Sequence, residues 1–183
     1  MKADITGVLV AEHRLILRMI GILVRNARET AEGRYKNWRF YLDGVDFIRE
    51  FADRFHHAKE EEILFAALVE NGMPAKSSPV AAMLMEHEEG RGFVRRMERA
   101  AASALAGIAG QERAISENAL AYAELLREHI AKEDDILYPL AERVIPEGMR
   151  AKIVKGYRAA EAGRDPDIAE RYRALVERYE GRC

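Results

Sequence analysis

The chain contains His56-His57-Ala58-Lys59-Glu60-Glu61-Glu62-Ile63-Leu64-Phe65, and a similar stretch, His129-Ile130-Ala131-Lys132-Glu133-Asp134-Asp135-Ile136-Leu137-Tyr138, follows later. Each stretch places a histidine four residues before a glutamate, which puts both side chains on one face of a helix. The apolar residues that follow continue this face toward a buried core. The two stretches therefore predict two amphipathic helices that bring imidazole and carboxylate groups into the interior.

The first of these stretches has two adjacent histidines, so its register is ambiguous. Comparison with the second stretch pairs His56 with Glu60. The alternative pairs His57 with Glu61, and leucines further along the helix continue that face. We interpret His57 and Glu61 as the inward-facing pair, and His56 and Glu60 as surrounding or surface residues.

The rest of the chain also has helical periodicity, and glycine, proline and serine residues divide it into segments. We expect long helices at about 4–31, 37–70, 79–106 and 111–144. The breaks are at Gly33, Asn71-Gly72-Met73-Pro74, Ser77-Ser78-Pro79, Gly107, Gly110 and Pro146. The tail, 147–181, is expected to form one or two shorter helices that break near 163–166.

Four long helices with short connections predict an all-α fold, an antiparallel up-down-up-down four-helix bundle. We assign residues 1–146 to this bundle. Residues 147–183 are expected to form a C-terminal helical extension that packs on the same domain, with a homodimer contact as the alternative role.

Each of the four long helices carries a histidine on its apolar face. These histidines are His13, His57, His87 and His129. In an antiparallel bundle all four lie roughly 12–21 Å from the same end, at a rise of 1.5 Å per residue. One such histidine is usually a hydrogen-bonded core residue, but four at one level, with two glutamates, predict a metal site.

The composition narrows the class of protein. The chain has 183 residues and a formal net charge of −2, with 29 Lys and Arg against 31 Asp and Glu. This balance predicts no nucleic-acid partner and no membrane association. Cys183 is the single cysteine, which excludes an internal disulfide and fits a cytoplasmic location. We expect this cysteine to lie at a frayed end.

The ordered set of motifs resembles the hemerythrin HHE cation-binding family. The matching stretches are Glu12-His13, His56-His57-Ala58-Lys59-Glu60-Glu61, Glu86-His87-Glu88-Glu89-Gly90-Arg91 and His129-Ile130-Ala131-Lys132-Glu133-Asp134. This resemblance implies a helical bundle that holds two non-haem iron ions joined by an oxygen bridge and two carboxylates. The implied metal ligands are His13, His57, Glu61, His87, His129 and Glu133.

The chain departs from the oxygen-carrying members of that family on its third helix. Those members have a second histidine four residues after the first, where this chain has Arg91. They also place an aspartate where Asp134 stands, whereas Glu133 fits the HHE pattern. One nitrogen ligand is therefore missing, and a water, Glu60, Asp134 or a tyrosine is expected to replace it.

The resemblance implies a di-iron protein that acts on or senses a small oxidant (O2, peroxide or NO), or that senses iron. A di-iron peroxidase or oxidase is the enzymatic alternative, so catalysis stays open. A bundle that binds zinc, or one that binds no metal and serves a structural role, is the third interpretation. Tyr122 and Tyr138 lie near His129 in the sequence, and we interpret them as packing residues rather than hydrogen-bond donors to the site.

Overall fold

Helices form all the regular secondary structure in residues 2–181, the part of the chain that the computed structural model describes. Cys183 lies outside these residues. The elements are α1 (Gly7–Ala31), α2 (Trp38–Phe47), η1 (Ile48–His57), η2 (Glu60–Leu64), α3 (Phe65–Glu70), α4 (Pro79–Leu105), α5 (Glu112–Lys132), η3 (Glu133–Leu137), α6 (Tyr138–Val144), α7 (Glu147–Ala162) and α8 (Ile168–Glu180). The all-helical prediction is confirmed for this region.

Several of these elements join into longer helices. The segment from α2 to α3 is continuous, and so is the segment from α5 to α6, because η1, η2 and η3 are π-helical turns within them. The predicted ends are correct to within a few residues. Helix α4 begins as expected, since the Ser78 side chain accepts a hydrogen bond from the Ala81 backbone N–H and Pro79 is the first helical residue.

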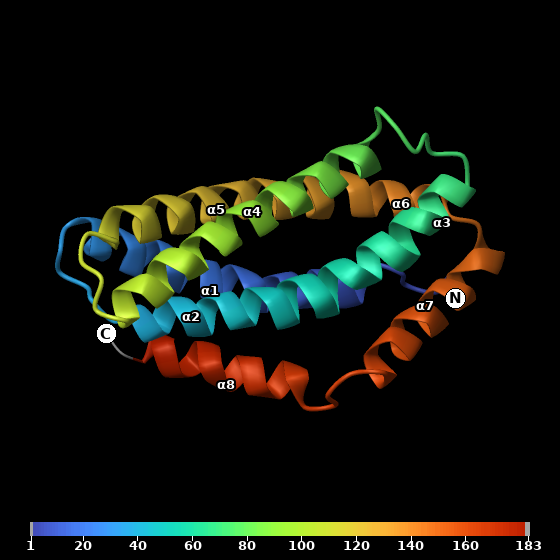
Figure 1. Cartoon of the computed structure of the whole chain (residues 1–183). Helices are drawn as coiled ribbons and strands as arrows, with labels where there is room; N and C mark the ends of the chain where they lie inside the picture. The colour runs from blue at the N-terminus through green and yellow to red at the C-terminus, as the bar shows by residue number, and fades with distance from the viewer. Residues whose placement is uncertain (1, 182–183) are drawn as a thin grey trace.

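The four long helices lie alongside one another (Figure 1). Contacts join α4 to α5, α1 to α5 and α2 to α4. In Figure 1 the red helix α8 runs beside the segment that begins with α2, and it contacts both α1 and η1. Helix α7 contacts η2. The tail therefore packs on its own chain.

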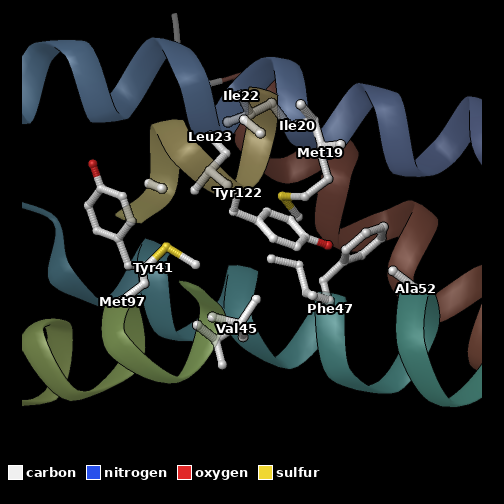
Figure 2. Close-up of a cluster of buried hydrophobic side chains, with 14 of the residues drawn as sticks. Met19, Ile20, Ile22, Leu23, Tyr41, Val45, Phe47, Ala52, Met97 and Tyr122 are labelled. Carbon is white, nitrogen blue, oxygen red and sulfur yellow. The ribbon is translucent and has the colours of Figure 1, made fainter. Parts of the chain in front are cut away.

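The apolar core consists of two clusters. The larger includes Met19, Phe47 and Tyr122, which Figure 2 shows packed between α1, α5 and the helix of Phe47. The smaller includes Leu9 and Leu64. The histidines of the sequence motifs fall between residues of the two clusters along each helix. A buried polar layer thus separates them.

No helix in the described part of the chain is both long enough and apolar enough to cross a lipid bilayer.

The packing of α8 can be tested at Tyr172. Its ring is buried against Phe47 and Phe51, and its hydroxyl donates a hydrogen bond to the Asp46 carboxylate (2.9 Å). Tyr172→Ala should lower the free energy of unfolding by about 3–5 kcal/mol, and Tyr172→Phe by about 1 kcal/mol. Urea denaturation at equal metal content measures both. A Tyr172→Ala loss no larger than that of the exposed control Arg173→Ala would mean that α8 does not pack as described.

Candidate metal centre

All five histidines and two glutamates meet in the buried polar layer. They form two groups, each of four residues whose potential ligand atoms lie within 4.8 Å of one another. The first group is His57, Glu60, His87 and His129, and the second is His13, His56, Glu60 and Glu133. Glu60 belongs to both groups, so the two sites adjoin each other.

The π-helical turns explain how two consecutive histidines both face the interior. A π-helix bonds residue i to residue i+5, so it takes more residues per turn than an α-helix and changes which of them face inward. His56 and His57 lie at the end of η1 and are only 1% and 6% exposed. Glu60 opens η2 and Glu133 opens η3, and neither is exposed at all. The local backbone thus sets the composition of the site.

Glu60 and Glu133 lie at the centre of the two groups. Oε1 of Glu60 is 3.6 Å from Nε2 of His56, and Oε2 of Glu60 is 3.6 Å from Nε2 of His87. Oε2 of Glu133 is 3.4 Å from Nε2 of His13 and 3.3 Å from Nε2 of His129. Each carboxylate therefore spans a pair of imidazoles that come from two different helices.

The electrostatics of the two central carboxylates differ. Burial, followed by the charge of Glu133, raises the pKa of Glu60 well above its usual value. Burial acts on Glu133 in the same direction, but the neighbouring His129 and His13 imidazoles outweigh it and hold the pKa of Glu133 well below its usual value. The two neighbouring carboxyl groups therefore differ in how readily each gives up its proton.

Every imidazole of the layer is held from behind by a carboxylate. The pairs, with their Nδ1–oxygen distances, are His13–Asp134 (2.8 Å), His56–Glu12 (2.8 Å), His57–Asp53 (3.3 Å), His87–Glu61 (2.7 Å) and His129–Glu86 (2.9 Å). In a neutral imidazole, a carboxylate that accepts the Nδ1–H hydrogen bond fixes the tautomer and leaves the Nε2 lone pair free. This arrangement is the one that metal-binding histidines usually have.

Cationic side chains stand behind these carboxylates. Lys59, which has no exposed surface, donates to Glu12 and also to Glu161 of α7 (2.9 Å). Arg91 binds Asp53 (2.7 Å) and Glu61 (2.8 Å). In the same way, Lys132 donates to Glu86. The centre is therefore surrounded by carboxylates and then by cations, and α7 takes part in this outer ring.

The residues present fit bound cations. The described residues offer no hydrogen-bond partner to Nε2 of His56, Oε2 of Glu60 or either carboxylate oxygen of Glu133, although all four atoms are buried. Nε2 of His87 and Nε2 of His129 are 2.9 Å apart while both Nδ1 atoms face carboxylates. Buried acceptors that lack a hydrogen-bond donor are costly unless a cation lies beside them. Imidazole and carboxylate donors suit iron and zinc.

Two tyrosines near the layer differ in role. The Tyr138 hydroxyl donates a hydrogen bond to Oε1 of Glu60, and its ring stacks on His13 with centroids 5.6 Å apart. The interpretation of Tyr138 as a packing residue alone was therefore wrong. The Tyr122 hydroxyl has no partner among the described residues and points toward Phe47 (Figure 2). Tyr122 is a packing residue, as expected.

The structure brings together five of the six residues expected as ligands, namely His13, His57, His87, His129 and Glu133. Glu61 is not among them, because its carboxylate binds Nδ1 of His87 and Arg91 at the edge of the layer. Glu60 stands in its place, and His56, expected outside the centre, joins the second group. The similarity of the two sequence stretches, which pairs His56 with Glu60, was the signal for this register.

His56 and His57 together bring the layer to five imidazoles, one more than the four expected. His57 stacks on His87 with ring centroids 3.8 Å apart, so two of the three imidazoles of the first group are adjacent. Asp134, expected as one substitute, instead holds Nδ1 of His13. Glu60, another of the expected substitutes, belongs to the first group itself.

A cavity of about 270 Å³ reaches the first group. His57, His87 and His129 form part of its lining, whereas His13 and His56 do not. The two groups therefore differ in access, and a molecule in the cavity meets the first one.

Comparison with known proteins agrees with this geometry. The family model described as the Hemerythrin HHE cation binding domain matches residues 4–141. The chain belongs to this family. The matched residues include both four-residue groups of histidines and glutamates, and the match ends before α7 and α8. No curated protein and no solved structure matches the chain.

Metal affinity should rise as the pH is raised from 7 to 9. Burial lowers the pKa of His13, but the hydrogen bond to Asp134 and the nearby Glu133 carboxylate outweigh it and raise this pKa to about 9. Below that pH the metal-free protein holds a proton on His13, which bound metal must displace. Each released proton gives about a tenfold gain in affinity per pH unit. Competition with a chelator at several pH values measures the slope, and a flat profile would contradict it.

Proposed function

We propose that this hemerythrin-family protein holds two non-haem iron ions and acts on, or senses, a small oxidant such as O2, peroxide or NO. The observation that carries the proposal is the pair of adjoining four-residue groups that share Glu60. One ion would be held by His57, His87 and His129, and the other by His13 and His56. Glu60 and Glu133 would lie between the two ions.

An iron pair, when bound, would supply electron transfer to an oxidant. The protein's own contribution lies in orientation and in control of water and protons. The carboxylates behind the imidazoles keep every Nε2 directed to the centre. The Tyr138 hydroxyl holds its proton against Glu60, and the two apolar clusters limit water on either side.

Access from one side favours small-molecule chemistry over a closed structural site. Structural zinc sites are usually four-coordinate and closed, whereas here a cavity leads to one group and the Glu60 carboxylate belongs to both. This argues for an open iron pair rather than for zinc or for a metal-free bundle. Whether an oxidant is turned over or only sensed is decided by the peroxide assay below.

The proposal includes the arrangement of the helices. We propose that the four long helices run up-down-up-down, as the short connections at 32–37, 71–78 and 106–111 favour. Residues 1–146 would form the hemerythrin-like bundle, and 147–183 an extension of the same domain. A cytoplasmic location stays a prediction.

Iron content separates the two registers of the first motif. Glu60→Ala should remove most of both irons, because Glu60 belongs to both groups. The matched control Glu61→Ala should keep about two irons per chain with affinity reduced roughly 10–100-fold, since Glu61 only orients His87. Metal analysis of protein from iron-supplemented medium gives both values. Loss of iron in Glu61→Ala with full occupancy in Glu60→Ala would reverse the assignment.

The iron-loaded protein should show an oxo-to-iron absorption band that disappears in His129→Ala. Reduced protein should react with O2, peroxide or NO, and absorption spectroscopy follows each reaction. Repeated consumption of peroxide would identify a peroxidase, and a single stoichiometric reaction would identify a sensor. A protein that binds only zinc, with no visible band after iron loading, would refute the proposed function.

A further inference from the structure

The cavity beside the first group is larger than a small oxidant requires. Its volume is about 270 Å³, and one water occupies roughly 30 Å³ of liquid. The space therefore holds roughly nine or ten non-hydrogen atoms. A diatomic molecule or peroxide would fill only a small part of it, so the volume suits an organic molecule.

The inner walls of the cavity are apolar. Ile48, Val94 and Leu126 line it, together with the ring of Tyr122 beside Gly90. A Cβ atom at Gly90 would lie 3.5 Å from the Tyr122 ring, which is ordinary van der Waals contact. The absence of a side chain at Gly90 thus leaves room for an apolar body without straining the helix.

Cationic groups line the outer part of the cavity, where the side chains reach solvent. These groups are Arg49, Arg54, Arg91 and Arg95. Three of them pair with acids that do not line the cavity: Arg49 with Glu98, Arg54 with Glu50 and Arg95 with Glu88. Each of these three arginines therefore lines the cavity, whereas its carboxylate partner does not.

The acidic lining residues Asp53 and Glu86 do not pair with Arg49, Arg54 or Arg95. Asp53 and Glu86 are already engaged, Asp53 by Arg91 and His57 and Glu86 by Lys132 and its histidine. Exposed ion pairs such as Arg54–Glu50 and Arg95–Glu88 contribute little to stability, so they can exchange partners at small cost. A planar guanidinium fork is well suited to a carboxylate.

We propose that this cavity is a binding site for a small organic acid with an apolar body. The carboxylate is held by the arginines at the outer end, and the apolar body lies between Ile48, Val94 and the Tyr122 ring. The site adjoins the first metal group but binds its ligand through its own residues. The proposal therefore goes beyond the di-iron function and stands or fails separately from it.

Calorimetric titration of the purified protein with octanoate tests this site. Octan-1-ol and octylammonium have the same apolar chain without the negative charge, so they should bind at least roughly tenfold more weakly. The double variant Arg54→Gln/Arg95→Gln should weaken octanoate binding by a similar factor. Arg113→Gln removes an exposed ion-paired arginine outside the cavity and should leave binding unchanged. Octanoate bound only through a metal ion would keep its affinity in the arginine variants. These variants therefore separate binding by the arginines from binding by a metal.

A steric pair of variants locates the binding. Gly90→Ala should keep both the fold and octanoate affinity, whereas Gly90→Leu should abolish binding by filling the cavity. Circular dichroism and thermal melting check that both variants fold. Equal binding of octanoate and octanol, octanoate binding that survives Gly90→Leu, or no binding at all would overturn the proposal. None of these results depends on whether the protein contains iron.

Discussion

Two carboxylates buried side by side impose the constraint that organises this protein. Glu60 and Glu133 are fully buried, and a buried negative charge is stable only with a counter-charge or strong hydrogen bonds. The imidazoles that face the two carboxylates supply part of the counter-charge, and bound cations would supply the rest of it. The carboxylates behind the imidazoles and the cations behind those carboxylates continue the alternation of charge outward.

The same alternation connects the helices. The bond from His56 to Glu12 joins η1 to α1, and the bond from His129 to Glu86 joins α5 to α4. Lys59 extends the network to Glu161 in α7, beyond the part of the chain that the hemerythrin family model matches. A ligand that binds the folded protein but not the unfolded chain stabilises the fold. Metal binding and helix packing are therefore expected to be coupled in this chain.

Local periodicity was enough to predict the helices and the level at which His13, His87 and His129 meet. It was not enough to choose between Glu60 and Glu61, because a π-helical turn shifts which of two neighbouring residues faces inward. Leu64, used to favour Glu61, lies four residues after Glu60 and is buried with it. The cavity could not be predicted either, since its lining comes from three helices that are far apart in the sequence.

Anomalous diffraction at the iron absorption edge tests the central claim most directly. Crystals of iron-loaded protein should give two peaks in the buried layer. One peak is expected among His57, His87 and His129, the other next to His13 and His56, with Glu60 and Glu133 between them. A single peak, or peaks bound through Glu61 at the edge of the layer, would contradict the account.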